Sequence, residues 1–307
     1  MSKLSTAFML LGKNKNMFLG QIVQNLNYLF PDKTYLNLLF KFRMGYWMDW
    51  KNPKTFSEKL QWLKIYNRNP LYTKLVDKFE VKGYVAEKIG SHHVAKNLGI
   101  WNTPEEIDFE SLPNQFVLKT THGGGNTGVI IVKDKSKADI ATLKSKLNLS
   151  LKQDLYKDSR EWPYKNVNKR ILAEEFLEDS ETGELRDYKF FCFNGVVKAL
   201  FVATERQTRE EPFFNFFDEN YEPLPVRQGH PCSDTIPAKP KLFDEMKQLA
   251  EILSKDIPCV RIDLYQVNGK IYFGEYTFYH FGGTVPFEPT EWDEKFGSWI
   301  DLSNIKP

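Results

Sequence analysis

The sequence has little cysteine, and its cysteines show no spacing typical of a metal or disulfide site. Cys192, Cys232 and Cys259 are odd in number and widely separated, and no C-x-x-C motif occurs. This usage argues against structural zinc and suits a reducing compartment, so we expect a cytoplasmic location. His92 and His93 are adjacent and would point in different directions, so we do not interpret them as metal ligands.

Long hydrophobic runs and a strong excess of one charge are also missing. No apolar segment approaches the roughly 18 residues of a membrane-spanning helix. The first 30 residues contain three lysines and no acid, but their apolar core is short and no small-residue cleavage site follows, so no signal peptide is expected. Peripheral contact of this segment with the inner face of a membrane stays open beside ordinary helix packing. The formal net charge of +2 is too small to imply a nucleic-acid partner.

The composition predicts a folded protein, either one large domain or two lobes that share a cleft. The 307 residues are 41% hydrophobic and 27% charged. Residues 1 to about 100 read as mainly helical. Thr55 or Ser57 is a candidate N-cap for a helix within 52–67, and residues 71–90 read as a second helix that ends at Gly90.

From Asn114 onward the pattern changes to strand pairs separated by helices, which is typical of an α+β fold. The predicted elements are a hairpin over 115–134 around a glycine-rich loop, a helix over 136–156, a strand over 169–177, a hairpin over 187–204 that turns at Asn194-Gly195, a helix over 239–255 and a hairpin over 259–277.

The last hairpin carries Arg261 and Asp263 on one strand and Glu275 and Thr277 on the other. These charges could lie on a solvated face. However, acids are depleted in strand interiors, and the neighbouring residues are large and apolar, which indicates burial. A buried carboxylate needs a partner such as arginine, a metal ion or backbone donors.

The turn of this hairpin allows two arrangements of the acids. A two-residue type I′ loop at Asn268-Gly269 would pair Asp263 with Gly274 and place Glu275 on the opposite face. A three-residue loop with a bulge at Gly269 would place both acids on one face. The hairpin sequence alone does not choose between them.

Three earlier motifs carry residues suited to binding phosphate or a nucleotide. Lys119 lies near a strand end before a run of three glycines, whose amides could point at an anion, although a simple hairpin tip would look the same. The segment 171–177 ends in two acids and Phe-Leu, which fits either an exposed strand end or an adenine-binding hinge. Asp187 and Lys189 share a strand face, as a surface ion pair or a ligand-facing pair.

Taken in order, these motifs resemble the ATP-grasp superfamily. Lys119 matches the family's phosphate-binding lysine, and Asp263 and Glu275, twelve residues apart, match its two magnesium carboxylates. Arg261 matches an arginine that stabilises the oxyanion in peptide-type members, with backbone amides near Gly282-Gly283. The family's third metal ligand, an asparagine, is Thr277 here. The resemblance implies ATP-binding roles for His122, Gly123, Gly124, Gly125, Glu174, Glu175, Phe176, Leu177, Asp187 and Lys189, with Lys189 also assisting catalysis.

The closer resemblance is to the TupA-like ATP-grasp proteins of bacterial surface-polysaccharide clusters. It rests on "NPKTFSEKLQWLK", "DKFEVKGYVAEKIG", "LPNQFVLKTTHGGG", "DYKFFCFNG" and "RIDLY" with "GEYTFY". It implies a two-lobe ATP-grasp fold with a mainly helical region over 1–112, a small lobe over 113–178 and a large lobe with the metal site over 179–307.

The activity implied by this resemblance is ATP-dependent coupling of a carboxylate to an amine, with two Mg²⁺ ions. The expected partners are an amino acid and a small-molecule or lipid-linked saccharide that contains a uronic acid. Three alternatives stay open: a glycosyltransferase, an ATP-grasp sugar kinase and a non-catalytic nucleotide-binding scaffold. No D-x-D motif is present, which removes one common metal motif of glycosyltransferases.

Overall fold

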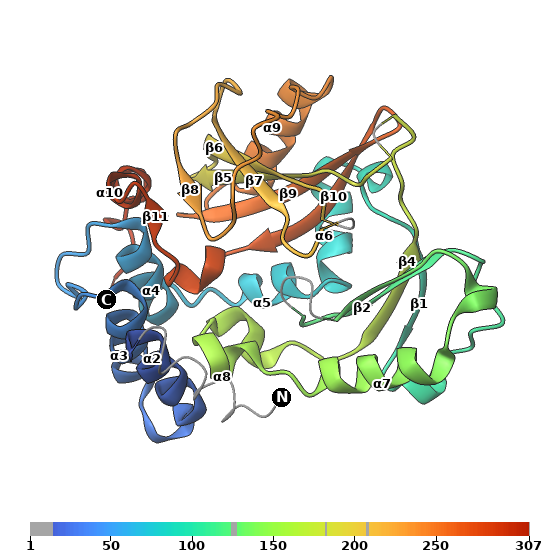
Figure 1. Ribbon diagram of the computed structural model, residues 1–307, viewed down its shortest axis with the longest axis horizontal. Helices are drawn as coiled ribbons and strands as arrows, with labels where there is room; N and C mark the ends of the chain where they lie inside the picture. Colours follow the sequence, from blue (N-terminus) through green and yellow to red (C-terminus); the bar gives the residue numbers. More distant parts are fainter. Residues whose placement is uncertain (1–14, 124–127, 182, 207–208, 307) are drawn as a thin grey trace.

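The computed structural model describes residues 15–123, 128–181, 183–206 and 209–306. Two main antiparallel sheets and a two-stranded one are surrounded by helices, so the described residues have the predicted α+β class (Figure 1). The strands are β1 (Asn97–Trp101), β2 (Phe116–Thr120), β3 (Val129–Val132), β4 (Ile171–Glu175), β5 (Asp187–Phe193), β6 (Val196–Thr204), β7 (Phe213–Asp218), β8 (Arg227–Gln228), β9 (Val260–Val267), β10 (Lys270–Thr277) and β11 (Phe287–Glu288). The two-stranded sheet pairs β8 with β11.

The helices lie before, between and after these strands. They are α2 (Lys15–Asn25), α3 (Asp32–Met44), α4 (Phe56–Tyr66), α5 (Leu71–Val76), α6 (Glu80–Ile89), α7 (Ile140–Leu151), α8 (Leu155–Ser159), α9 (Phe243–Leu253) and α10 (Glu291–Ser298). A short 3₁₀ segment, η6 (His280–Gly283), follows β10.

The larger sheet has the strand order β10-β9-β5-β6-β7 and forms the main core of the protein. One face packs on α9, where the rings of Phe190 and Phe243 lie 6.0 Å apart. Because side chains alternate along a strand, Lys189 and Phe191 point to the other face. There Lys189 lies opposite Asp263 and Phe191 opposite Arg261 in the β5–β9 register. The predicted metal-site residues therefore share the face that α9 leaves uncovered.

The smaller sheet has the order β1-β4-β2-β3 and one face on α7 (Figure 1). Its core side chains include Phe116 and Leu118 from β2, which pack with Leu147 of α7. The alternate residues Val117 and Lys119 face away from that core.

The N-terminal helices do not form an isolated unit, because α4, α5 and α6 contribute to the core of the larger sheet. Helix α4 begins after Thr55, whose side chain forms a capping box with Glu58, so the predicted N-cap is confirmed. The single helix predicted over 71–90 is wrong. The chain leaves the helix at Asp77, whose Oδ1 accepts from the amides of Phe79 and Glu80, and α6 starts at Glu80.

Two further boundaries differ from simple expectation. The helix predicted over 136–156 starts at Ile140, because Asp139 caps the amides of Ala141 and Thr142, and it ends at Leu151 before the separate α8. Strand β1 lies within the segment 1–112 yet pairs with β4, so that segment supplies an edge strand to the smaller sheet.

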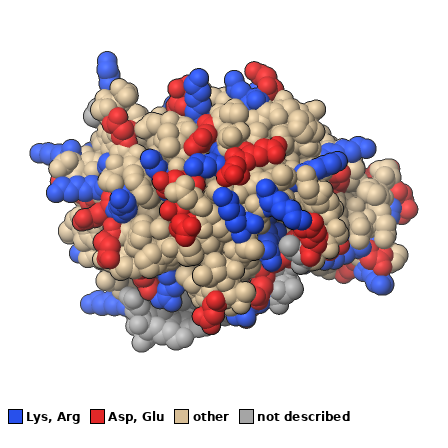
Figure 2. Space-filling view, turned by 90° about the horizontal axis from the view of Figure 1, so that it is seen from above, with Lys and Arg blue, Asp and Glu red and all other residues tan. Residues whose placement is uncertain are grey.

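Charged side chains of both signs are interspersed on the face shown in Figure 2. Within the part of the chain that the structure describes, no helix combines the length and apolarity needed to span a bilayer. Residues 1–14 of the 30-residue N-terminal segment considered for membrane contact lie outside the described residues.

Candidate active site

The β9–β10 hairpin resolves the question of the two acids in a way that neither alternative anticipated. Asn268 and Gly269 form a two-residue turn with φ values of 49° and 74°. However, the register shifts between Phe273 and Glu275, so that Glu275, and not Gly274, lies opposite Asp263. The bulge is therefore in the strand at Gly274, and it returns both acids to one face.

Gly274 suits this bulge because the backbone of β9 approaches it closely. A Cβ at this position would lie 3.0 Å from the Asp263 carbonyl oxygen and 3.0 Å from a ring carbon of Tyr265. Only glycine fits here without displacing one of these groups.

Arg261 is the centre of the cluster on this face. Its Nε donates to Asp263 Oδ1 and its Nη2 to Asp263 Oδ2, both at 2.7 Å. Nη2 also donates to Thr277 Oγ1 at 3.0 Å and Glu275 Oε1 at 3.3 Å. Nη1 lies 2.7 Å from His280 Nδ1. The four residues that sequence reasoning placed on the hairpin thus meet around one guanidinium group.

Lys189 joins this cluster to a second carboxylate. Its Nζ contacts Asp263 Oδ2 and lies 2.6 Å from Asp187 Oδ2. Arg206 Nη1 donates to the same Asp187 oxygen at 2.7 Å. Asp187 and Asp263 are only 1% and 0% exposed, and each of these buried acids has two cationic partners that compensate its charge.

The two buried acids differ in how their surroundings shift the pKa. Burial alone would raise the pKa of Asp263, but Arg261 and Lys189 outweigh it and hold the pKa below its usual range. For Asp187, burial prevails over Lys189 and Arg206, and the pKa is raised. Burial beside Arg261 also holds the pKa of His280 well below its ordinary value.

A cavity of about 660 Å³ runs from this cluster to the smaller sheet. Its wall includes Lys119, Glu174, Glu175, Phe176, Leu177, Asp187, Lys189, Arg261, Glu275 and Thr277. The structure therefore brings together predicted residues from β2, β4, β5, β9 and β10. Asp263 lies behind this wall, in contact with Lys189 and Arg261.

At the end of the cavity near the smaller sheet, two lysines hold one acid. Lys119 Nζ contacts Glu174 Oε2, and Lys82 Nζ lies 2.7 Å from Glu174 Oε1. Glu174 is 5% exposed, and the two lysines overcome the effect of burial and lower its pKa. Val81, Val94, Val117, Ile131 and Phe273 supply apolar wall around this end. The combination of an apolar slot and clustered cations suits a nucleotide.

Lys78 and Lys82 are cavity residues that sequence reasoning missed. Lys78 Nζ contacts the Gly123 carbonyl oxygen and lies 3.6 Å from Glu275 Oε2. It therefore connects the loop after β2 to the β9–β10 hairpin. Lys78 lies in the turn before α6 and Lys82 in the first turn of that helix, so the two lysines of "DKFEVK" do not share one helical face, and no local signal in the sequence pointed to them.

Some of the predicted residues do not reach the cavity wall. His122 is 3% exposed, and its ring nitrogens have no hydrogen-bond partner among the described residues. Burial and the charge of Lys169 lower its pKa to about 4. Gly123 is near the cavity only through its carbonyl contact with Lys78, and Gly124 and Gly125 lie outside the described residues. Gly282 does line the cavity, but its amide, expected near an oxyanion, donates to the Tyr279 carbonyl at 2.8 Å.

The oxygen donors fit a hard divalent cation. Arg261 Nη2 is the point on which the oxygens of Asp263, Glu275 and Thr277 converge. The positive guanidinium group therefore already lies where these three oxygen donors meet. No group of three or more His, Cys, Asp or Glu side chains is positioned for a metal in the described ranges. Mg²⁺ commonly takes one or two protein carboxylates together with substrate phosphates, so two acids suffice.

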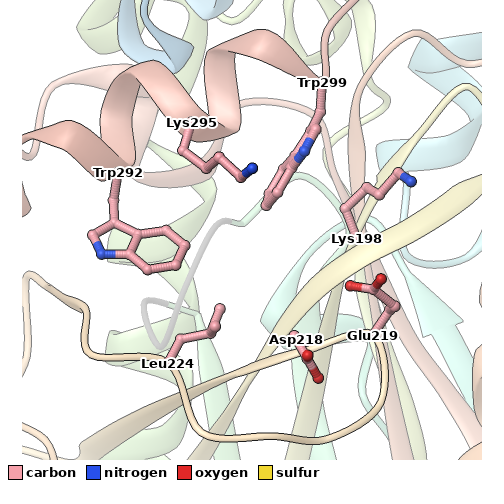
Figure 3. A pocket seen from close by; sticks show the side chains of 7 residues that line it. All are labelled: Lys198, Asp218, Glu219, Leu224, Trp292, Lys295 and Trp299. Carbon is pink, nitrogen blue, oxygen red and sulfur yellow. The ribbon is translucent and has the colours of Figure 1, made fainter.

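A smaller cavity of about 230 Å³ lies away from these residues, between α10 and the loop after β7. Figure 3 shows Trp292 and Lys295 of α10, with Trp299 just after that helix, on one side and Leu224, Asp218 and Glu219 on the other. None of the predicted site residues lines it.

A family model described as TupA-like ATPgrasp matches residues 58–301. The match covers well over half of the chain, and the protein belongs to the TupA-like ATP-grasp family. The resemblance found in the sequence and the predicted ATP-grasp fold are therefore confirmed. Comparison with curated proteins gave no match.

Solved structures similar to this chain include three ligases. A D-alanine–D-alanine ligase from Bacillus anthracis is 17% identical with a TM-score of 0.40, over 66% of this chain and 57% of that one. The corresponding enzyme from Helicobacter pylori is 14% identical with a TM-score of 0.38, over 81% and 70%. A phosphoribosylamine–glycine ligase from Thermotoga maritima is 17% identical with a TM-score of 0.40, over 67% and 48%. The chain thus spans little more than half of the first of these structures.

Proposed function

We propose that the protein is an ATP- and Mg²⁺-dependent carboxylate–amine ligase that works through an acyl phosphate. The observation that carries this proposal is Arg261, which lines the cavity between two carboxylates on one side and the lysines of the nucleotide end on the other. A cation at this point suits the oxyanion of an acyl-transfer step, which a simple phosphate transfer to a hydroxyl does not form.

In this proposal the two ends of the cavity have different tasks. Lys119, Lys82 and Lys78 counter the charge of the ATP phosphates, and Phe176 and Leu177 contact the adenine. Asp263, Glu275 and Thr277 would hold Mg²⁺, which supplies charge neutralisation at the transferring phosphate.

The chemistry has two steps. A carboxylate oxygen of the acyl donor attacks the γ-phosphorus, the bond to the β-phosphate oxygen breaks, and ADP leaves. The amine then attacks the acyl carbon, a tetrahedral oxyanion forms and collapses, and phosphate leaves as the amine loses a proton. Arg261 stabilises the oxyanion, and Lys189 keeps Asp263 ionised beside it.

The substrates we propose are an amino acid and a uronic acid of a bacterial surface polysaccharide, either nucleotide-linked, lipid-linked or polymeric. Family membership supports this setting, and so do the aromatic walls of the cavity beyond Arg261, which suit a ring-shaped acceptor. Phe201, Phe214, Phe281, Tyr164 and Tyr279 line that part. We place the reaction in the cytoplasm.

An ADP-release screen with mass spectrometry of the products tests this proposal. Purified protein is incubated with ATP, Mg²⁺, a panel of amino acids and a panel of uronic acid derivatives. We expect ADP release that requires both substrates and a product whose mass is that of the two minus water. Glu275→Gln should abolish this turnover while ATP still binds.

Each alternative activity gives a different result in the same screen. ADP release without an amine, with a phosphorylated sugar, would replace the ligase with a kinase. Release of the nucleotide from a nucleotide sugar would indicate a glycosyltransferase. Binding of ATP with no turnover on any pair would favour a scaffold.

A further inference from the structure

The five N–H groups of Arg261 are almost all committed to its own protein. The Nε hydrogen is donated to Asp263 Oδ1, and the two Nη2 hydrogens are donated to Asp263 Oδ2, Thr277 Oγ1 and Glu275 Oε1. Of the two hydrogens on Nη1, one is directed to His280. Among the described residues the second Nη1 hydrogen has no acceptor, and Arg261 lines the cavity. A single N–H therefore remains for a ligand.

The bond to His280 fixes the protonation form of the imidazole. An arginine N–H can only donate, so His280 Nδ1 accepts, and the proton of the neutral ring is on Nε2. The ring is 2% exposed and packs against Phe191, Phe201 and Phe281, with centroids 5.0, 5.4 and 4.3 Å away. His280 is thus a rigid acceptor, because aromatic rings hold it in place.

The backbone after His280 is held in an unusual form. Phe281, Gly282 and Gly283 all have positive φ, at 50°, 61° and 64°. The Gly282 carbonyl accepts from Gln61 Nε2 and Lys64 Nζ, each at 2.8 Å, and both donors come from α4. A non-glycine residue in this region is strained, and such strain persists only where the surroundings enforce it.

His280 differs from the other partners of Arg261 in what a divalent cation would do to it. Asp263, Glu275 and Thr277 are hard oxygen donors that Mg²⁺ would draw away from Arg261 Nη2. His280 also lines the cavity, but its Nδ1 faces Arg261 Nη1, and a neutral imidazole nitrogen is a weaker ligand for Mg²⁺ than these oxygens are. The bond from Nη1 to His280 is therefore the one that can stay when the carboxylates change partner.

We propose that His280 is a positioning residue that anchors Arg261 through Nη1 and thereby directs the remaining Nη1 hydrogen at the oxyanion of the substrate. This inference rests on the proposed ligase function for its kinetic consequence. The anchoring itself depends only on the geometry of Arg261 and His280.

The chain offers a matched set of substitutions. His280→Asn places Oδ1 where Nδ1 was and keeps the acceptor. His280→Gln moves its oxygen to about the Nε2 position, and His280→Phe removes the acceptor but keeps the ring. His93 is the control, because it is also buried and its Nδ1 lies 2.8 Å from the Ile271 carbonyl oxygen, away from Arg261.

Nuclear magnetic resonance of ¹⁵N-histidine-labelled protein tests the anchor without any turnover. His280→Asn assigns the signals of the ring. We expect an unprotonated Nδ1 and a protonated Nε2 at neutral pH, unchanged when Mg²⁺ and ADP are added. A protonated Nδ1, or a change of tautomer on adding Mg²⁺ and ADP, would overturn the proposal.

Single-turnover kinetics with the substrate pair from the ADP-release screen tests the consequence. We expect His280→Asn and His93→Asn to stay near wild type. His280→Gln and His280→Phe should lower the rate about tenfold per folded molecule, with unchanged ATP affinity, as for loss of one hydrogen bond. Equal rates for His280→Asn and His280→Gln would overturn the positioning role.

The two arms separate this inference from the proposed function. If the screen finds a kinase or a scaffold and the resonances still show the expected tautomer in all nucleotide states, the ligase proposal fails and the anchor stands. If the ligase activity is found and His280→Phe is as fast as wild type, the anchor has no role in the chemistry.

Discussion

Replacing Lys189 with methionine tests the charge arrangement on which the site depends. Lys189 is 6% exposed and lies directly opposite Asp263 in the β5–β9 register. Methionine has a similar length and no charge, so Lys189→Met removes the cation and leaves little space to fill. Asp263 then keeps Arg261 as its partner, and Asp187 keeps Arg206.

The cost of this change follows from the contacts that disappear. Lys189 makes two charge-assisted bonds to nearly inaccessible carboxylates, and each is worth about 1.5–3 kcal/mol. Breaking a buried pair typically costs about 3–5 kcal/mol because a charge is left without compensation. Since both acids retain an arginine, we expect the low end, about 3 kcal/mol of the free energy of unfolding.

Urea unfolding at pH 7.5, followed by tryptophan fluorescence, measures this loss. Lys133→Met is the control, because Lys133 pairs with Glu178 at 3.3 Å and both side chains are about half exposed. We expect that control to change stability by about 0–1 kcal/mol. Adding Asp187→Asn to Lys189→Met should restore part of the loss, because it removes the charge of one of the two buried acids that have each lost a cationic partner. A Lys189→Met protein within 1 kcal/mol of wild type, or no recovery in the double variant, would refute the reasoning.

Three further changes have definite expected outcomes. Lys119→Met should weaken ATP binding about 10- to 100-fold by calorimetry, since a charged hydrogen bond to phosphate is lost, and equal affinity would remove Lys119 from the site. Gly274→Ala should lower stability by about 1–3 kcal/mol in thermal unfolding because its Cβ would meet β9, whereas Gly83→Ala, where a Cβ meets nothing within 4 Å, should not. Asp293→Asn should raise the free energy of unfolding at pH 7. Burial is the main cause that raises the pKa of Asp293 from 3.8 to about 6. Wild type therefore loses up to about 3 kcal/mol of stability as the pH rises from about 4 to above 6, because the folded state holds this proton more tightly than the unfolded state does. An equal response of the two proteins to pH between 4 and 7 would contradict this.

Much of the fold could be predicted because its local signals are strong. The Asn194-Gly195 and Asn268-Gly269 dipeptides occur as two-residue turns with positive φ at both residues. The helix before β9 and the hairpin around the glycine-rich loop also occur where the pattern predicts them. In these segments a few adjacent residues determine the backbone.

The site was less predictable where long-range contacts decide the geometry. The bulge at Gly274 depends on the close approach of β9, and a lone glycine in a strand does not reveal the shift in register. The break at Asp77 was missed because helical periodicity continues through it. Its side chain caps α6 and also pairs with Arg170, which is far along the chain. His280 escaped notice for the same reason, since its partner Arg261 belongs to another element.

The hydrogen bonds from α4 to the Gly282 and Gly283 carbonyls have a consequence for how this protein can be divided. Gln61 and Lys64 support a segment more than two hundred residues later in the chain, and Ser57 binds Asp293 in the same way. A chain that began after α4 would keep every residue of the cavity wall, from Lys78 onward, and would lose the hydrogen bonds that hold the Gly282 and Gly283 carbonyls. The N-terminal boundary of a fragment that keeps this support is therefore set by α4, well before Lys78, the first residue of the cavity wall.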